Sequence, residues 1–467
     1  MTLLLLVLIT VVSMQLHAEE VQYQIRFNRA LTESQTDLCF DRDRAPSMLI
    51  TGSRAAVTML KDLQVTGGSV RRKANRLYLT PDSDRICLRL VQRFDARNSN
   101  HNWRKQRNGA MRFNGDLMIP IGSWLWRPAK LKPNQRLRLM FDLPAGMAIS
   151  APWPQLASNQ YHVDYQMPYN WSGRLAVGRF SPKPVEVGGK TLNVALVGGL
   201  ESRENLLNWI VQAAEAVANV SGYFPTDQTQ VLVLPVGPDK EAVPWAEIQR
   251  QGRPSVHFFV DQHRPIYEFT SDWTAVHEFS HLLHPYILRT DAWLYEGIAS
   301  YYQNIARARS GMLSEKQAWQ KLYEGFQRGS KRLGGSVLRD SNRIMQIYWG
   351  GAALILMADV ELRQRSKGRQ SIERVLHQFR QCCGEDMGPW SAKAMFLRLD
   401  QLSGLDTLTR LYRQQVSQRS FPEVYGMLNK LGVKVRNGQV YLDDNAPLAE
   451  IRREIVWGRE TSVGVIR

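Results

Sequence analysis

The spacing of apolar residues changes along the chain. Up to about residue 165, short apolar runs with partial alternation, such as VQYQIRF, RLYLT and RLRLMFDL, are separated by clusters of Gly, Pro, Asn and Asp. This pattern is typical of strands and turns, so it predicts a β-rich region. Pro152, Pro154 and the polar stretch after them mark the end of that region.

From about residue 190 the pattern predicts strands at 192–198, 231–237 and 255–261 and a helix at 203–220. Alternating strands and helices favour a mixed sheet packed with helices. SVHFFVD, which begins at Ser255, is the last of these apolar strands.

Beyond Ser271 the spacing is mostly helical. Ser314 and Gln317 form a capping-box pattern, and Asn437-Gly438 between alternating residues predicts a hairpin. The chain is therefore predicted to be an α+β multidomain protein. The predicted divisions are a signal peptide at 1–18, a β-rich domain at 19–165, a mixed α/β domain at 166–330, and a mostly helical domain with a terminal hairpin at 331–467.

The first residues have the composition of an export signal. An uncharged apolar run from Leu3 to Val12 precedes Leu16-His17-Ala18. The run is shorter than the roughly 20 apolar residues that a membrane-spanning helix needs. We therefore predict cleavage after Ala18 and a periplasmic or secreted protein, with a retained N-terminal membrane anchor as the alternative.

Four cysteines are compatible with export, since an even number permits disulfide bonds in an oxidising compartment. Cys39 and Cys87 both lie in the predicted β-rich domain and can pair there. A bond between the adjacent Cys382 and Cys383 is sterically awkward. None of the four has the spacing of a zinc–thiolate site, so we expect structural or buried pairs.

The formal net charge is +17, with basic clusters at 71–73, 104–107 and 363–369. Such an excess favours anionic partners, including acidic peptides or an anionic envelope surface, and a solvated basic surface is the simpler interpretation. No zinc finger, basic zipper or aromatic–basic RNA motif is present, so no nucleic-acid partner is expected. The sequence gives no indication of the oligomeric state.

The stretch HEFSHLLHP, which begins at His277, places two histidines and a glutamate in an apolar run. Charged groups are rarely buried unless they are paired or bind a metal. If residues 271–284 form one helix that ends before Pro285, His277 and His281 lie one turn apart on the same face. Two imidazoles at this spacing can bind one zinc ion, with Glu278 within reach of a water on it.

Zinc needs a third protein ligand and an open position. Glu296 is the best candidate, because it lies in DAWLYEGIASYYQNIARAR, a second predicted helix that a short turn joins to the first. Antiparallel packing of the two helices brings Glu296 back over the histidines. His284 is a rival ligand, but three ligands in one helical row do not surround an ion well.

HEFSHLLHP followed by WLYEGIASYYQ resembles the gluzincin metallopeptidases, most closely the glycyl aminopeptidase family, with the membrane alanyl aminopeptidases as cousins. The resemblance implies that His277, His281 and Glu296 hold one Zn²⁺ ion and that Glu278 is the general base. It also implies that the domain at 166–330 is thermolysin-like and catalytic.

The segment YWGGAALILMADVELRQRSKG resembles the helix on which these families carry an oxyanion-stabilising tyrosine. The resemblance implies this role for Tyr348, with a packed helix aromatic as the alternative. The spacing between His281 and Glu296 is shorter than in the alanyl aminopeptidases by about one helical turn. The element that grips the substrate amine in those cousins has no clear equivalent, and the resemblance implies that SVHFFVD is the sheet edge beside the substrate.

These features predict a zinc metallopeptidase that cleaves a peptide or protein substrate, as an aminopeptidase or an endopeptidase. Glu278 would take a proton from the attacking water, and Tyr348 would stabilise the oxyanion together with the ion. Two alternatives stay open. One is a catalytically degenerate envelope protein that keeps the scaffold for binding, and the other is a zinc hydrolase of a non-peptide substrate.

Overall fold

The computed structural model describes residues 19–98, 103–131, 135–164, 173–200, 203–250, 253–331, 337–383 and 389–458. The predicted signal peptide at 1–18 lies outside these residues. Contacts within the chain divide it into two compact units. Unit 1 consists of Met1–Phe94, Gly122–Pro144 and Trp153–Pro168, and unit 2 of Asp95–Ile121, Ala145–Pro152 and Tyr169–Arg467.

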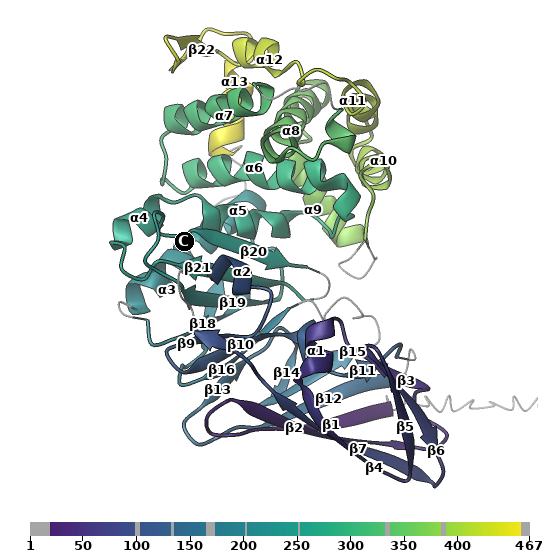
Figure 1. The fold of residues 1–467 in the computed structure, drawn as a ribbon. Coiled ribbons are helices and arrows are strands. Elements are labelled where there is room, and N and C mark those ends of the chain that lie inside the picture. Colours follow the sequence, from purple (N-terminus) through teal and green to yellow (C-terminus); the bar gives the residue numbers. More distant parts are fainter. Residues whose placement is uncertain are drawn as a thin grey trace, which may run out of the picture. The chain divides into compact units, whose positions relative to one another are not determined.

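Unit 1 is built mainly of strands (Figure 1). A seven-stranded sheet has the order β14-β15-β12-β1-β2-β7-β4, and a four-stranded sheet has the order β11-β3-β6-β5. The elements are β1 (Glu19–Phe27), β2 (Glu33–Asp41), β3 (Met48–Ile50), α1 (Arg54–Met59), β4 (Leu60–Thr66), β5 (Gly68–Lys73), β6 (Arg76–Pro81), β7 (Arg85–Arg93), β11 (Arg127–Pro128), β12 (Gln135–Asp142), β14 (Gln155–Ala157) and β15 (Gln160–Asp164). Side chains on β2 and β7 alternate between buried and more exposed positions, as expected for a sheet with one face on a core.

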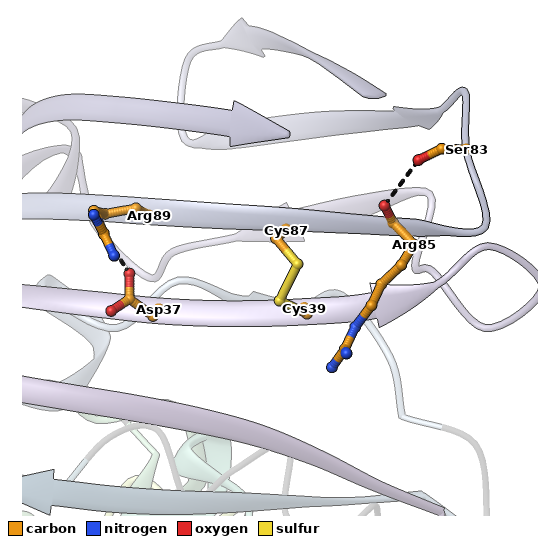
Figure 2. Close-up of a disulfide and its surroundings, with 6 residues drawn as sticks. All are labelled: Asp37, Cys39, Ser83, Arg85, Cys87 and Arg89. Atoms are coloured by element: carbon orange, nitrogen blue, oxygen red, sulfur yellow. Dashed lines mark hydrogen bonds and ion pairs between the residues drawn. A yellow bond between two sulfur atoms is a disulfide. The ribbon is translucent and has the colours of Figure 1, made fainter. Parts of the chain in front are cut away.

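Cys39 and Cys87 lie directly opposite each other on the antiparallel strands β2 and β7 and are joined by a disulfide bond (Figure 2). An ion pair between Arg89 Nε and Asp37 Oδ1, 2.7 Å apart, links the same two strands. The predicted pairing is therefore confirmed. Cys382 and Cys383 are also joined, in spite of the expected steric difficulty.

Unit 2 contains two five-stranded sheets, with the orders β13-β16-β10-β9-β8 and β17-β18-β19-β21-β20. Their strands are β8 (Arg97–Asn98), β9 (Met111–Phe113), β10 (Asp116–Pro120), β13 (Ala148–Ser150), β16 (Arg174–Gly178), β17 (Lys183–Val187), β18 (Lys190–Leu196), β19 (Gln228–Pro235), β20 (Trp245–Gln249) and β21 (Ser255–Val260). Strands β18, β19 and β21 are parallel and match the three predicted strands. β20 is antiparallel to β21 and ends the sheet.

The expectation that SVHFFVD forms the sheet edge is wrong. β21 lies between β19 and β20, and all six of its residues are buried. A fully apolar run of this kind is typical of an interior strand, because both of its faces are covered. The edge is β20, whose sequence WAEIQ is partly exposed.

The two faces of the second sheet pack against different layers. Phe113 and Ala176 from the first sheet share a hydrophobic cluster with Leu232 and Phe259 from the second. On the other face lie α3 (Arg203–Ser221) and α5 (Thr274–Ser280), with residues of the second sheet in one core. The site described below lies along α5 and the edge strand.

The predicted helix at 271–284 is divided in the structure. α4 (Ile266–Ser271) ends at Asp272, α5 begins at Thr274, and the 3₁₀ turn η3 (His281–Leu283) follows. The Asp272 carboxylate accepts a hydrogen bond from the Thr274 backbone N–H at 2.7 Å. This contact starts a new helix, since it satisfies one of the free donors at the N-terminus.

Helices dominate the chain beyond α5 (Figure 1). The remaining elements are α2 (Trp103–Gln106), η4 (Arg289–Asp291), α6 (Ala292–Arg309), α7 (Glu315–Ser330), η5 (Leu338–Asp340), α8 (Ile344–Ser366), α9 (Ile372–Cys383), α10 (Ala392–Ser403), α11 (Thr407–Gln415), α12 (Val424–Lys430), β22 (Val433–Arg436), β23 (Gln439–Leu442) and α13 (Ala449–Trp457). The capping box of α7 at Ser314 and the β22–β23 hairpin at Asn437-Gly438 are both confirmed.

The C-terminal helix α13 packs against α6 and α8. Arg309 Nη2 on α6 donates to the Ile455 carbonyl at 2.8 Å and pairs with Glu373 at 2.7 Å. Arg363 on α8 lies 3.5 Å from Glu454 of α13. A hydrogen bond to α6 and an ion pair with α8 thus join the last helix to the two central ones.

The chain is a multidomain α+β protein with a β-rich N-terminal region and a helical C-terminal part. The division into domains at 166–330 and 331–467 stays a prediction. Within the described residues, every helix is too short or too polar to cross a membrane.

Candidate metal centre

His277 lies in α5, and His281 is the first residue of η3, which follows directly. Every residue of α5 is buried, and the rings of His277 and His281 have centroids 4.9 Å apart. Each imidazole Nε2 lies near the same oxygen, Oε2 of Glu296, at 3.2 Å for His277 and 3.6 Å for His281. The structure therefore brings these three predicted residues together.

Glu296 reaches the histidines from α6, one turn from the start of that helix. α6 is held close to α8 by two facing glycines. A Cβ on Gly297 would come within 2.6 Å of the Gly351 Cα, and a Cβ on Gly351 would overlap the Trp293 carbonyl oxygen. The two backbones are thus in direct contact beside Glu296.

The donor atoms of this group fit a divalent metal. One potential ligand atom from each of His277, His281 and Glu296 lies within 4.8 Å of the other two. Ligands at about 2.0–2.1 Å from a tetrahedral zinc ion are about 3.3–3.4 Å apart. The observed separations of 3.2 and 3.6 Å lie on either side of this spacing.

Gln303 fixes the orientation of the first histidine. Its Oε1 accepts a hydrogen bond from His277 Nδ1 at 2.8 Å, so the neutral ring carries its proton on Nδ1. The lone pair on Nε2 then faces the Glu296 carboxylate. Two such acceptors repel each other unless a proton or a cation lies between them, and a metal ion satisfies this requirement.

The pKa shifts of His277, His281 and Glu296 agree with a cation or proton between them. Burial lowers the pKa of His281 well below its usual value, so that ring is neutral. Burial acts on His277 in the same direction, but the hydrogen bond and charge of Glu296 outweigh it and raise the pKa of His277. Burial raises the pKa of Glu296, yet His281 and His277 hold that pKa below its usual value.

Glu278 lies next to the first histidine and lines the same cavity. Only 8% of its surface is exposed, and burial raises its pKa to about 8. A carboxyl group with such a pKa can take up and release a proton near neutral pH.

Tyr348 comes from α8, across the site from α5. Its ring stacks on that of His277, with centroids 5.5 Å apart and planes 3° apart. Burial raises the pKa of the phenol, and the neighbouring charges of Glu296 and Glu278 raise it further. Tyr348 is therefore a neutral hydrogen-bond donor at the cavity wall.

His284 lies apart from the group of three. Its Nδ1 is 2.7 Å from the Pro285 carbonyl and 3.1 Å from Arg250 Nη1. Arg250 also donates to the carbonyl oxygens of His281 and His284, and Arg380 Nη2 donates to that of Leu282 at 2.7 Å. These arginines place positive charge at the C-terminal end of the helix, where its carbonyl groups lack helical partners.

A cavity of about 780 Å³ is lined in part by His277, His281 and Glu296. Residues 243–250, which include all of β20, line one side, and α5 with the start of α6 lines the other. The edge strand and Gln303 were not predicted from the sequence. Gln303 could have been found, because it lies seven residues after Glu296 and therefore two turns along the same face of α6.

Part of the chain matches a known protein family. Residues 273–343 match the family model described as M61 glycyl aminopeptidase. No curated protein sequence gives a significant match to the chain.

Solved structures share the fold. An aminopeptidase N family protein from Idiomarina loihiensis superposes with a TM-score of 0.68 at 15% identity, over 91% of this chain and 80% of that chain. An M1 zinc metallopeptidase from Deinococcus radiodurans gives a TM-score of 0.53 at 15% identity, over 87% of this chain and 94% of that chain. A mutant of that enzyme bound to a Tyr-Ser-Ala substrate gives a TM-score of 0.55 at 15% identity, over 87% of this chain and 95% of that chain.

The matched segment begins just before α5, contains both histidines and Glu296, and ends just before α8. The resemblance inferred from HEFSHLLHP and WLYEGIASYYQ is thereby confirmed. Residues 273–343 are similar to the M61 glycyl aminopeptidase family, and the chain is a peptide-bond hydrolase.

Proposed function

We propose that the protein is a zinc metallopeptidase in which His277, His281 and Glu296 hold one zinc ion. The convergence of two imidazole nitrogens on one carboxylate oxygen is the observation that carries this proposal. When bound, zinc would supply Lewis-acid polarisation of the scissile carbonyl and a water that is acidic near neutral pH. The zinc metallopeptidases with this fold make zinc the natural metal.

The residues around the ligands have separate roles. Glu278 would take the proton of the attacking water and later pass it to the leaving amine, because it lines the cavity next to His277 and a cation on the ligands would favour its charged form. Tyr348 donates a hydrogen bond to the oxygen on which negative charge develops, since its phenol is neutral and reaches the cavity. The backbone of β20 pairs with an extended substrate and orients it.

Replacing Glu278 by Gln tests the proposal. The variant should bind one zinc ion per chain, as the wild type does, and should lose peptide hydrolysis by about 10²–10⁴-fold. Zinc is measured by atomic absorption and hydrolysis by mass spectrometry of a peptide library, with and without a chelator. Full activity in a zinc-loaded Glu278→Gln protein would rule out the mechanism.

The same assay separates the alternatives. A degenerate binding protein would bind the peptides without cleaving them, and a hydrolase of another class would leave the library intact. The names of the relatives suggest release of N-terminal residues, and a comparison of peptides with free and blocked N-termini decides this.

We also propose export of the chain, on the composition of residues 1–18. Its basic surface would face an anionic envelope.

A further inference from the structure

One face of the four-stranded sheet in unit 1 is partly exposed (Figure 1). Leu49, Leu77 and Leu79 on β3 and β6 are buried on the opposite face. Because side chains alternate along a strand, the residues between these leucines belong to the exposed face. The strand register places them in two rows across the sheet. One row contains Ile50, Arg76 and Lys73, and the other contains Met48, Tyr78 and Arg71.

Three cations lie next to one another on this face. Lys73 and Arg76 are directly opposite each other on β5 and β6, and Arg71 is two residues before Lys73 on the same side. All three side chains are exposed. Like charges at opposed positions of a sheet destabilise it. Within the part of the chain that the structure describes, none of the three forms an ion pair with a carboxylate.

The seven-stranded sheet of the same unit treats its arginines differently. Arg26 and Arg89 flank Asp37, each at 2.7 Å. Arg138 pairs with Glu20 at 3.2 Å. Each of these pairs joins adjacent strands. The cations of the smaller sheet do not stabilise it in this way, so a ligand outside the chain is the natural source of the missing negative charge.

Tyr78 lies among these cations. The Arg71 guanidinium lies over its ring, 4.7 Å from the centroid. A hydrogen bond with Arg76 lowers the pKa of Tyr78, and the charges of all three cations add to this, although burial acts in the opposite direction. The lowered pKa agrees with a positive potential over the face, which attracts anions.

The same face carries apolar surface. Met48, Ile50 and Tyr78 are half-buried, so each presents part of its side chain between the cations. A small soluble anion gains nothing from apolar contact. A lipid bilayer takes up apolar and aromatic side chains at its interface while Lys and Arg contact anionic headgroups. The combination therefore fits an anionic membrane better than a soluble anion.

We infer that this surface docks the protein on an anionic phospholipid membrane. The inference rests on the proposed envelope contact, which it assigns to one surface of unit 1, and it is independent of the proposed peptidase activity. Docking of this kind is peripheral and needs no membrane-spanning helix. We call the surface the cationic sheet face, and it consists of Met48, Ile50, Arg71, Lys73, Arg76 and Tyr78.

Sedimentation with lipid vesicles tests the inference on the purified full chain. Vesicles that contain phosphatidylglycerol should bind the protein, and vesicles of phosphatidylcholine alone should bind it far less. Arg71→Gln, Lys73→Gln and Arg76→Gln together should weaken binding by about 100-fold, since each cation at an anionic membrane contributes about fivefold. Salt at about 0.5 M should also weaken binding, because it screens the charges. Equal binding of the triple variant and the wild type would overturn the inference.

A matched control removes the same charge from unit 2. Lys367, Arg369 and Arg374 are exposed cations at the end of α8 and in α9. Replacing all three by Gln should leave vesicle binding unchanged within about twofold, because these charges lie outside the cationic sheet face. A loss as large as that of the first triple variant would show that the overall charge drives binding and would contradict the inference.

A further variant separates a membrane from a soluble polyanion. Met48→Thr with Ile50→Thr keeps the charge and places residues of high β-propensity in the strand. It should weaken vesicle binding by about fivefold, because less apolar surface is buried, and leave binding to polyphosphate unchanged. If it does not fold, Tyr78→Thr takes its place. Vesicle binding equal to that of the wild type would make the face a general anion site and overturn the membrane inference.

Peptide hydrolysis and zinc content are measured on the same preparations. Every variant should keep both, since none of the substituted residues lines the cavity beside His277. A wild type that cleaves peptides but does not bind anionic vesicles would remove only this inference. A wild type that binds the vesicles but cleaves no peptide would remove only the proposed peptidase function.

Discussion

The protonation state of Glu278 depends on the charge next to it. In the metal-free protein, burial raises its pKa to about 8, so the carboxyl is protonated at neutral pH. A divalent cation on the neighbouring ligands would favour the charged form and lower this pKa. Glu278 can therefore act as a base only when the metal site is filled.

This gives the stability of the metal-free protein a defined pH dependence. Because the folded pKa of Glu278 lies above its ordinary value, its contribution is fully present below about pH 4.5 and is lost as pH rises through about 8. Metal-free Glu278→Gln lacks this titration. It should therefore be more stable than metal-free wild type by about 2–4 kcal/mol near pH 8. Thermal unfolding in chelator, followed across this range, measures the difference, and parallel pH profiles would contradict it.

Gln303 holds His277 by a hydrogen bond and does not reach the cavity. Losing such a partner typically lowers metal affinity by about 10–100-fold, because the ring is no longer fixed in one tautomer. Gln303→Leu should show this loss in competition with a chromogenic chelator, whereas Gln303→Glu should keep the affinity. Equal affinity of the Leu variant and the wild type would show that packing alone orients His277.

Local spacing was sufficient to predict that three residues come together, but not the segments around them. His277, His281 and Glu296 follow from helix geometry over twenty residues, so the pattern predicted how they would meet. The break before α5 was missed because it depends on one side-chain contact, Asp272 to Thr274. The edge strand was missed because WAEIQ has little apolar character, while the more apolar SVHFFVD suggested a substrate-binding strand and is in fact buried.

The contact between α6 and α8 leaves no room for a side chain. In Gly351→Ala, the new methyl group would overlap the Trp293 carbonyl, so the helices must separate and move Tyr348 away from Glu296. We expect a loss of about 1–3 kcal/mol in unfolding free energy, together with reduced activity. Denaturant unfolding and kcat/KM measure the two effects.

Gly426→Ala is the control for that substitution. Gly426 lies in α12, and a Cβ there would meet no atom within 4 Å. Alanine at an exposed helical position should stabilise the protein by about 0.5–1 kcal/mol. If both substitutions had the same effect, close helix packing would not be what positions Tyr348.

The two compact units should respond separately to loss of the β2–β7 disulfide. The bond joins residues 48 positions apart, and a closed loop of that length stabilises by about 4 kcal/mol in the chain-entropy model. Cys39→Ser with Cys87→Ser should weaken unit 1 by about this amount. Zinc content should not change, because all three proposed ligands lie in unit 2. Scanning calorimetry and metal analysis test both statements, and loss of zinc would contradict the second.

The helix α13 has a practical consequence for handling the protein. It supplies a carbonyl to Arg309 and a carboxylate to Arg363, and these arginines belong to the same helices as Glu296 and Tyr348. Trimming the chain before Ala449, or joining a purification tag or fusion partner so that this helix cannot fold, would leave two buried guanidinium groups short of acceptors. Enzyme prepared in that way would resemble an inactive mutant although every active-site residue was intact.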